Sequence, residues 1–220
     1  RLLELTKPVA TAVVPISAGR HIYKREPSFP IAVACDPAFN FVYEANIRYL
    51  HHLGEVTYFS PLADTSLPDV GFVYLPGGYP ELYLAALSAN RQMLQSIRRY
   101  VESGGKLLAE CGGMMYLCDE IRDKNGYVYP MAGVLHQSAT MENMKLRLGY
   151  RTLLYNETRL KGHEFHYSRL VEQQNPLPSC AVAYTAKGVE TDTPLYHYKN
   201  VWAGYTHLYW ADPVGNEWFT

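Results

Sequence analysis

The chain has 220 residues, enough for one domain with a full hydrophobic core or for two small domains. Hydrophobic residues make up 48% of it and charged residues 19%, which excludes a disordered or fibrous chain, and a net charge of -1 without a basic tract argues against a nucleic-acid surface. No apolar run reaches the roughly 20 residues of a membrane span, and four cysteines without paired spacing predict reduced thiols in a cytoplasmic protein.

Residues 1–30 lack the pattern of a domain start. A short apolar stretch over 9–16 is interrupted by a proline, which argues against a signal peptide, and a polar, basic stretch over 17–27 follows it. We therefore expect 1–30 to be the end of a preceding domain and a linker, and 31–220 to form a single domain.

From residue 31 to about 118, strand-like and helix-like patterns alternate. Tyr43, Ile47 and Leu50 have helical spacing, and Gly54 closes that pattern. The predicted strands are 31–35, 56–59, 72–75 and 106–109, and the predicted helices are 43–53 and 90–103. This alternation is typical of an α/β fold with a doubly wound, mostly parallel sheet.

The second half of the chain contains strand-like segments and no long helical pattern. An Asn125-Gly126 pair between Ile121 and 127–129 predicts a hairpin turn. Further predicted strands are 146–155, 163–167, 181–184 and 201–205. We expect these to be mixed or antiparallel strands that lie against the first half.

The segment 108–117 (LAECGGMMYL) has the pattern of a nucleophile elbow, because a buried strand runs into Cys111, two glycines and a predicted helix. Gly112 and Gly113 would let the backbone turn sharply beside a substrate. A helix N-terminus would lower the pKa of the thiol and offer N–H groups to an oxyanion. The local pattern also fits a buried structural cysteine, which is how we interpret the other three cysteines: Cys35, Cys118 and Cys180.

A thiol nucleophile requires a base, and His207 is the candidate. It follows the strand predicted at 201–205, and residues after the strands of an open α/β sheet meet at the active crevice. His163 and His166 have a spacing that places them on opposite faces of a strand and does not match His-Glu-x-x-His, so no metal site is predicted.

A second glycine turn follows the strand predicted at 72–75, within 76–81 (PGGYPE). Its glycines could turn a backbone N–H toward a developing negative charge, or the segment could be a plain type II turn before a helix. Neither a GxxxxGK[ST] loop nor a GxGxxG motif is present, so no nucleotide cofactor is expected in this chain.

Five segments, in this order, resemble the glutamine amidotransferase domain of the cobyrinate a,c-diamide synthase family: 36–46 (DPAFNFVYEAN), 76–81 (PGGYPE), 109–113 (AECGG), 162–168 (GHEFHYS) and 206–209 (THLY). The cysteine elbow is shared by class I glutamine amidotransferases in general. The segments 76–81 and 162–168 narrow the resemblance to the cobyrinate type. Together the matches extend over about residues 31–210.

The resemblance implies a flavodoxin-like fold and one half of a two-domain ligase of cobalamin biosynthesis. In such a ligase, an N-terminal synthetase domain of the same polypeptide uses ATP and magnesium to activate the a and c carboxylates of the corrinoid ring. The C-terminal domain, which this chain resembles, hydrolyses L-glutamine and supplies the ammonia. No cofactor is implied for this domain, and a homodimer is one assembly to consider.

The resemblance also implies the roles of individual residues. Cys111 attacks the glutamine amide, the N–H groups of Gly78 and Gly112 stabilise the oxyanion, and His207 transfers the proton. Many class I members carry a glutamate two residues after the histidine, where this chain has Tyr209. Either the site is a Cys–His dyad or Glu164 replaces that acid. Further candidates for binding or orienting the substrate are Gly77, His166 and Tyr167.

Several alternatives remain open from the sequence. A related amidase that acts on nickel-sirohydrochlorin or on a peptidoglycan precursor would share this half. Another cysteine hydrolase of the same fold, such as a peptidase, would act on peptide amides and not on free glutamine. A catalytically silent interaction module would leave Cys111 unreactive toward electrophilic glutamine analogues.

Overall fold

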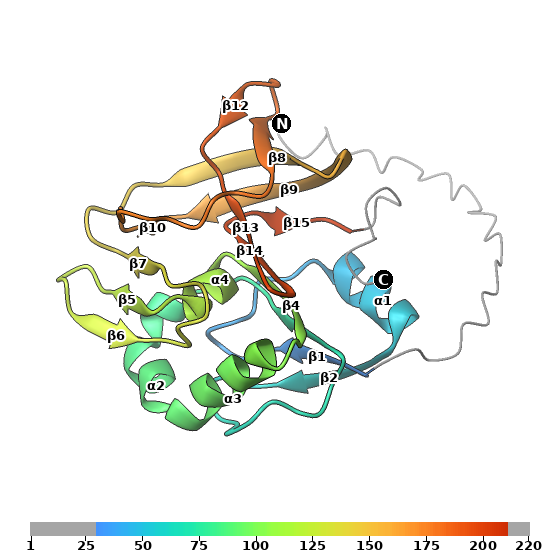
Figure 1. Cartoon of the computed structure of the whole chain (residues 1–220), viewed down its shortest axis with the longest axis vertical. Coiled ribbons are helices and arrows are strands. Elements are labelled where there is room, and N and C mark those ends of the chain that lie inside the picture. Colours follow the sequence, from blue (N-terminus) through green and yellow to red (C-terminus); the bar gives the residue numbers. More distant parts are fainter. Residues whose placement is uncertain (1–29, 211–220) are drawn as a thin grey trace, which may run out of the picture.

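The computed structural model describes residues 30–210, and its centre is a six-stranded sheet (Figure 1). In spatial order its strands are β13 (Leu195–Tyr198), β14 (Val201–Gly204), β4 (Lys106–Glu110), β3 (Phe72–Leu75), β1 (Pro30–Ala34) and β2 (Glu55–Phe59). Five strands are parallel, and β13 pairs antiparallel with β14. This confirms the predicted mostly parallel sheet. The expectation of a linker at 1–30 concerns residues that lie outside the described part, except for Pro30, which begins β1.

Helices pack on both faces of the central sheet. They are α1 (Glu44–Leu53), the short 3-10 helix η1 (Pro80–Leu82), α2 (Leu84–Ala89), α3 (Arg91–Glu102) and α4 (Gly112–Leu117). Apolar residues of α2, α3 and α4 pack with Val73 and Leu107 on one face, whereas Leu50 of α1 packs with Phe72 and Leu108 on the other. The sheet is therefore doubly wound, with strands that are buried on both faces.

The two predicted helices are confirmed, and Gly54 ends the first one as predicted. Tyr43 and Gly54 flank α1, and the Gly54 N–H donates to Leu50 O at 3.0 Å. Asn90 caps α3, because its side-chain oxygen accepts from the Met93 N–H at 3.3 Å. None of the helices within the described residues is long and apolar enough to cross a membrane.

The second half adds two smaller sheets. One contains β10 (Arg169–Leu170), β7 (Ser138–Thr140), β5 (Glu120–Arg122) and β6 (Val128–Pro130), and the other contains β12 (Glu190–Thr191), β11 (Val182–Thr185), β8 (Arg147–Tyr155), β9 (Thr158–His166) and β15 (His207–Leu208). The hairpin predicted at Asn125-Gly126 joins β5 and β6, and Gly126 has a φ of 84°. Figure 1 shows β8 and β9 across the central sheet from α2 and α3.

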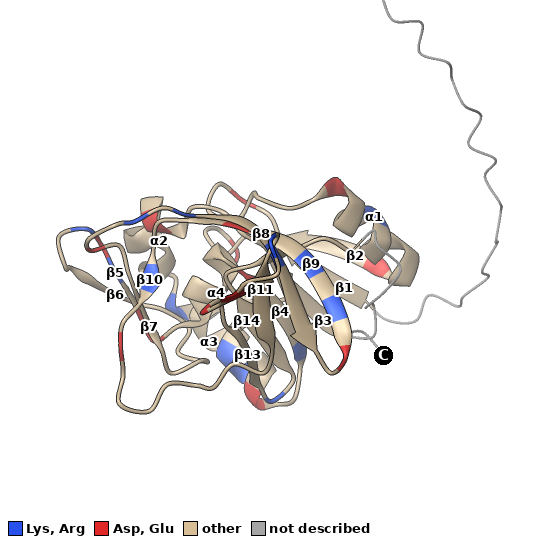
Figure 2. Cartoon of the chain, turned by 90° about the horizontal axis from the view of Figure 1, so that it is seen from above, with Lys and Arg blue, Asp and Glu red and all other residues tan. Residues whose placement is uncertain are grey.

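One expectation for the second half is wrong. The strand at 201–205 does not join the additional strands, because β14 inserts into the central sheet and pairs in parallel with β4, Val201 opposite Leu107. Val201 and Ala203 are fully buried, so β14 extends the core rather than covering it. In Figure 2 charged residues are dispersed over the outer elements, while β1 and β3 carry none.

Candidate active site

Cys111 forms the whole turn between β4 and α4. Its φ of 47° and ψ of −105° are unusual for a residue with a side chain, so the turn is strained. Two hydrogen bonds hold it: the Cys111 N–H donates to Gly204 O at 2.7 Å, and the Met115 N–H donates to Cys111 O at 3.0 Å. This is the geometry of a nucleophile elbow, as the sequence pattern predicts.

The glycines around Cys111 allow two loops to approach each other closely. A Cβ at Gly112 would lie 2.8 Å from Pro80 Cδ and 3.2 Å from the Gly78 nitrogen, and a Cβ at Gly78 would lie 2.1 Å from Ala38 O. Larger residues would force these segments apart. The structure therefore brings Gly78 and Gly112, the two predicted oxyanion residues, side by side next to Cys111.

A narrow cavity opens onto the thiol. The Cys111 Sγ atom lies 4.0 Å from Phe165 O at the end of β9. The cavity is lined by residues of three segments: Gly78, Tyr79, Glu81, Cys111, Met115, Phe165, His166, Tyr167 and Ser168. Two of the predicted substrate-binding residues, His166 and Tyr167, are thus in the wall of the nucleophile cavity.

The pKa of the Cys111 thiol is raised to about 12, mainly by burial and next by the charge of Glu81, while the Gly112 N–H lowers it. The N–H at the start of α4 lowers this pKa as expected, but burial outweighs it and the net shift is upward. The α4 helix has only six residues, and removal of the thiol from water dominates. Such a thiol is protonated near neutral pH and depends on a base for its reactivity.

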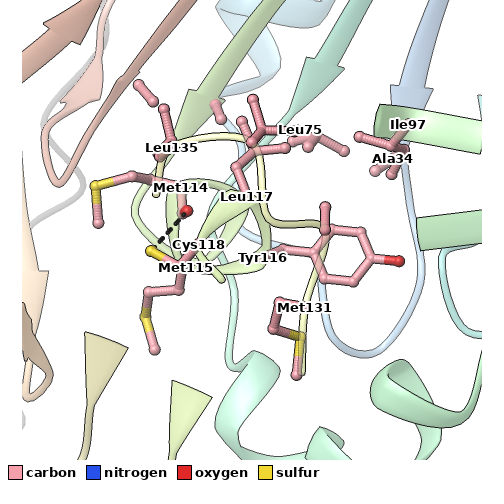
Figure 3. Close-up of a cluster of buried hydrophobic side chains, with 14 of the residues drawn as sticks. Ala34, Leu75, Ile97, Met114, Met115, Tyr116, Leu117, Cys118, Met131 and Leu135 are labelled. Carbon is pink, nitrogen blue, oxygen red and sulfur yellow. Dashed lines mark hydrogen bonds between the residues drawn. The ribbon is translucent and has the colours of Figure 1, made fainter. Parts of the chain in front are cut away.

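Cys118, seven residues later, has the structural role predicted for it. It is fully buried in the hydrophobic cluster at the end of α4, and its thiol donates to Met114 O at 3.6 Å (Figure 3). Burial also raises the pKa of this thiol. The two cysteines therefore differ in setting: Cys111 faces a cavity, and Cys118 faces only the core.

His207 begins β15, antiparallel to β9 and opposite His163. The ring is almost entirely buried, and burial lowers the pKa of His207 to about 3, with His163 and His166 as further causes. Gly77 makes room for it, because a Cβ there would lie 2.1 Å from His207 Cε1. A neutral imidazole can accept a proton, as a base must.

The His207 ring is held by other rings. His163 stacks on it with 4.9 Å between centroids and 19° between planes, and the edge of Phe41 contacts it at 4.6 Å. His163 is itself fixed by the Tyr43 hydroxyl, 2.5 Å from its Nδ1 atom. The sequence interpretation did not single out Phe41 or Tyr43, although both lie in the segment 36–46 that carries the resemblance.

Neither Glu164, the candidate for the orienting acid, nor Tyr209, which takes the usual place of that acid in the sequence, contacts the His207 ring within the described residues. Glu164 is buried, and its carboxylate forms an ion pair with Arg151 at 2.6 Å. Tyr209 is 44% exposed, and its ring meets Tyr43 edge-on at 5.2 Å. The His207 Nδ1 atom has no hydrogen-bond partner in the part of the chain that the structure describes.

Cys111 and His207 are linked through the intervening glycines. No hydrogen bond between Sγ and the imidazole is present within residues 30–210, and such bonds are often long before substrate binds. Instead, His207 packs on Gly77, and the next residue, Gly78, lies against Gly112. No group of three or more His, Cys, Asp or Glu side chains in these residues is arranged to hold a metal ion.

A cysteine elbow on a parallel sheet, with glycine N–H groups and a histidine beside it, defines a class I glutamine amidotransferase fold. Solved structures agree: PurLQS from Thermotoga maritima has a TM-score of 0.56 and 19% identity, over 81% of this chain and 86% of that one. A second structure, described as a glutamine amidotransferase, has a TM-score of 0.53 and 18% identity, over 80% of this chain and 89% of that one.

The chain belongs to the CobB/CobQ-like glutamine amidotransferase domain family, whose sequence pattern matches residues 30–214. It is 40% identical over 185 residues to the hydrogenobyrinate a,c-diamide synthase of Pseudomonas aeruginosa, covering 81% of this chain and 41% of that protein. The cobyrinate a,c-diamide synthase of Fusobacterium nucleatum is 40% identical over 188 residues, with the same coverage. The family resemblance is confirmed. The chain spans less than half the length of these relatives.

Proposed function

We propose that this chain is the glutamine-hydrolysing part of a ligase that amidates the a and c carboxylates of a corrinoid in cobalamin biosynthesis. The observation that carries the proposal is the strained Cys111 elbow, with Gly78, Gly112 and His207 gathered around it. The names of the relatives support the corrinoid acceptor. Because those relatives are more than twice as long as the match, the remaining length can hold a synthetase domain.

In the proposed mechanism, Cys111 Sγ attacks the side-chain amide carbon of L-glutamine while His207 removes the thiol proton. The N–H groups of Gly78 and Gly112 donate to the oxyanion, and one such donor is worth about 3–4 kcal/mol of transition-state stabilisation. His207 then protonates the departing ammonia, which leaves a thioester on Cys111. Water, activated by the same histidine, releases glutamate and restores the thiol.

Both pKa shifts oppose proton transfer from Cys111 to His207 in the resting site. Burial keeps His207 neutral and Cys111 protonated in the resting site, so no thiolate–imidazolium pair waits for the substrate. Proton transfer therefore accompanies attack on a bound amide. A thiol that is inert until glutamine fills the cavity is protected from unrelated electrophiles and oxidants.

The geometry favours a Cys–His dyad. The packing of Gly77 and the stacked ring of His163 orient the imidazole, whereas Glu164 pairs with Arg151. We assign His166 and Tyr167 to binding of the glutamine backbone groups, since both line the nucleophile cavity. ATP and magnesium belong to the proposed synthetase domain of the same polypeptide, and free thiols fit a cytoplasmic location.

The test combines kinetics with covalent labelling. The chain should release glutamate and ammonia from L-glutamine, and Cys111→Ser should abolish this without unfolding the domain. A glutamine-mimicking diazoketone should label Cys111 alone, with protection by free glutamine, as located by mass spectrometry of a digest. A label on Cys118 or Cys35, or parent-rate hydrolysis by Cys111→Ser, would contradict the proposal.

The acceptor is tested separately, in the full-length ligase with ATP and magnesium. Cobyrinate and hydrogenobyrinate, named in the two relatives, should each be offered with glutamine as nitrogen donor, and the diamide measured by mass. Glutamine hydrolysis without amidation of either corrinoid would keep the glutaminase and reject the proposed acceptor.

A further inference from the structure

Leu208, the residue directly after the proposed base, is bound through both of its backbone groups by buried side chains. Its N–H donates to Glu110 Oε1 at 3.1 Å, and its carbonyl accepts from Asn46 Nδ2 at 2.7 Å. Leu208, Glu110 and Asn46 are each at most 2% exposed. A buried strand normally satisfies these backbone groups through a neighbouring strand, so the use of two polar side chains here is unusual.

These two side chains are fixed in turn. Glu110 Oε2 accepts a hydrogen bond from the Tyr74 hydroxyl at 2.7 Å, and Asn46 Oδ1 accepts one from the Trp210 N–H at 2.9 Å. Tyr74 lies on β3 and is fully buried. Each oxygen of the Glu110 carboxyl therefore has a donor. The network joins two strands of the central sheet, β3 and β4, to the helix α1 on one of its faces.

The position of Glu110 gives this network its significance. Glu110 is the last residue of β4, immediately before Cys111, and it binds the residue immediately after His207. The strand that carries the base has only two residues of its own, His207 and Leu208. Without the two side chains, the ladder to β9 would hold this segment by itself.

Burial of a carboxyl costs free energy of hydration that burial of an apolar side chain of similar size would not cost. Burial raises the pKa of Glu110 to about 8, although hydrogen bonds from Tyr74 and Leu208 oppose the shift. An apolar side chain would fill this space without loss of hydration. The carboxyl oxygens are therefore best explained by the groups that they bind.

We propose that Glu110 and Asn46 are positioning residues, which hold the His207–Leu208 segment and thereby fix the imidazole relative to Cys111. They supply from the nucleophile side the constraint that class I members obtain from a carboxylate after the histidine. This inference rests on the proposed glutaminase function for its kinetic readout. The hydrogen bonds themselves do not depend on that function.

The test compares Glu110→Ala with Glu110→Gln. The alanine variant removes the acceptor of the Leu208 N–H, and a displacement of the base by about 1 Å would lower kcat roughly 100-fold. KM should change little, because neither Glu110 nor Leu208 lines the cavity at Cys111. The glutamine variant retains one oxygen for Leu208 and an N–H that can donate to Tyr74, so it should recover most of kcat.

A second readout follows the His207 ring by NMR titration of its Cε1–H group. Burial holds the pKa of His207 at about 3, and a loosened segment would admit water, so Glu110→Ala should raise this pKa toward about 6.5. The titratable groups that face the ring are His163 and His166. Their titrations should be followed in the same spectra, so that a change in their charge is recognised.

Thr140→Val is the matched control, because Thr140 is fully buried and hydrogen-bonded in β7, outside the Leu208 network. It should lower the free energy of unfolding without changing kcat or the pKa of His207. Unchanged kcat and pKa in Glu110→Ala, or equal losses in Thr140→Val, would overturn the inference.

Two further outcomes are decisive. If Glu110→Ala does not fold, Asn46→Ala removes the other bond to Leu208, and the same two readouts support or overturn the inference. If the parent chain hydrolyses no glutamine, the proposed function fails, and the NMR titration alone decides whether Glu110 holds the segment.

Discussion

The proposed nucleophile and the proposed base of this site are held in different ways. Cys111 is fixed mainly by its own segment, which is β4, one strained residue and α4, together with one backbone hydrogen bond to Gly204 O at the end of β14. His207 is fixed by side chains and loops from distant parts of the sequence, among them Phe41, Gly77 and His163. The elbow therefore relies mainly on its own segment, whereas the base depends on several remote residues.

This contrast has a consequence for catalysis. A variant remote from His207 in sequence can misplace the base while the elbow and its thiol remain intact. Loss of turnover with an intact fold of the elbow should then be the common phenotype of substitutions around the base.

Among variants that leave the elbow at Cys111 intact, His207→Asn should cause the largest loss of kcat. A positioned general base contributes 10²–10⁴-fold, so kcat should fall by about that factor. His163→Asn is the matched control: it removes the stacked ring and leaves the base, and it should cost less. Initial rates of glutamate release measure both. Equal losses of kcat in the two variants would show that His207 is not the base.

Gly77→Ala should displace the base without touching the thiol. Its new Cβ would lie 2.1 Å from His207 Cε1, and such a displacement should lower kcat about 100-fold. Labelling of Cys111 by the glutamine-mimicking diazoketone should slow as well, because the protonated thiol depends on the base for its reactivity. Gly104→Ala, where the nearest side-chain atom is 3.9 Å away but φ is +93°, controls for loss of stability alone.

The titrations of His207 and of Glu110 should make the free energy of unfolding depend on pH in opposite directions. The pKa of His207 is lowered to about 3 on folding, so its stabilisation is complete above about 6.5 and is lost as the pH falls toward 3. The pKa of Glu110 is raised to about 8, so its contribution is complete below about 4.5 and is lost as the pH rises through 8.

Urea unfolding at several pH values measures this dependence. A single proton changes the free energy of unfolding by at most about 1.4 kcal/mol per pH unit. His207→Asn should flatten the acid side of the curve, and Glu110→Gln should flatten the alkaline side. Parent-like slopes in both variants would show that other groups control the dependence.

Tyr43→Phe and Tyr209→Phe should have the smallest effects, and they should differ. Tyr43→Phe removes the hydroxyl that fixes His163 Nδ1, so kcat should fall by a few-fold, as loss of one hydrogen bond of about 1 kcal/mol predicts. Tyr209→Phe removes a hydroxyl with no contact to the base within the described residues, so activity should stay unchanged. A larger loss in Tyr209→Phe would give it the orienting role.

Sequence reasoning found the elbow because its signal is local. A strand, Cys111, two glycines and a helix lie within ten residues, and each element has its own pattern. The end of α1 at Gly54 was predictable for the same reason. The position of His207 after a strand was also predictable, from the general position of crevices in open sheets, whereas the insertion of that strand into the central sheet was not.

The surroundings of the base were not predictable, because they depend on pairings between distant residues. Glu110 and Leu208 are 98 positions apart, and Tyr43 and His163 are 120 apart. The raised pKa of Cys111 has a similar origin. The end of β9 covers the thiol, and no pattern around the elbow shows that cover.

The path of the chain from β14 to β15 gives the site a mechanical property. β14 belongs to the central sheet and β15 to the five-stranded sheet, with only Tyr205 and Thr206 between them. His207 therefore lies where the two sheets meet, while Cys111 follows a strand of the central sheet. A displacement of one sheet relative to the other would change the distance between Cys111 and His207. We therefore expect the rate of glutamine hydrolysis to depend on how the two sheets are aligned.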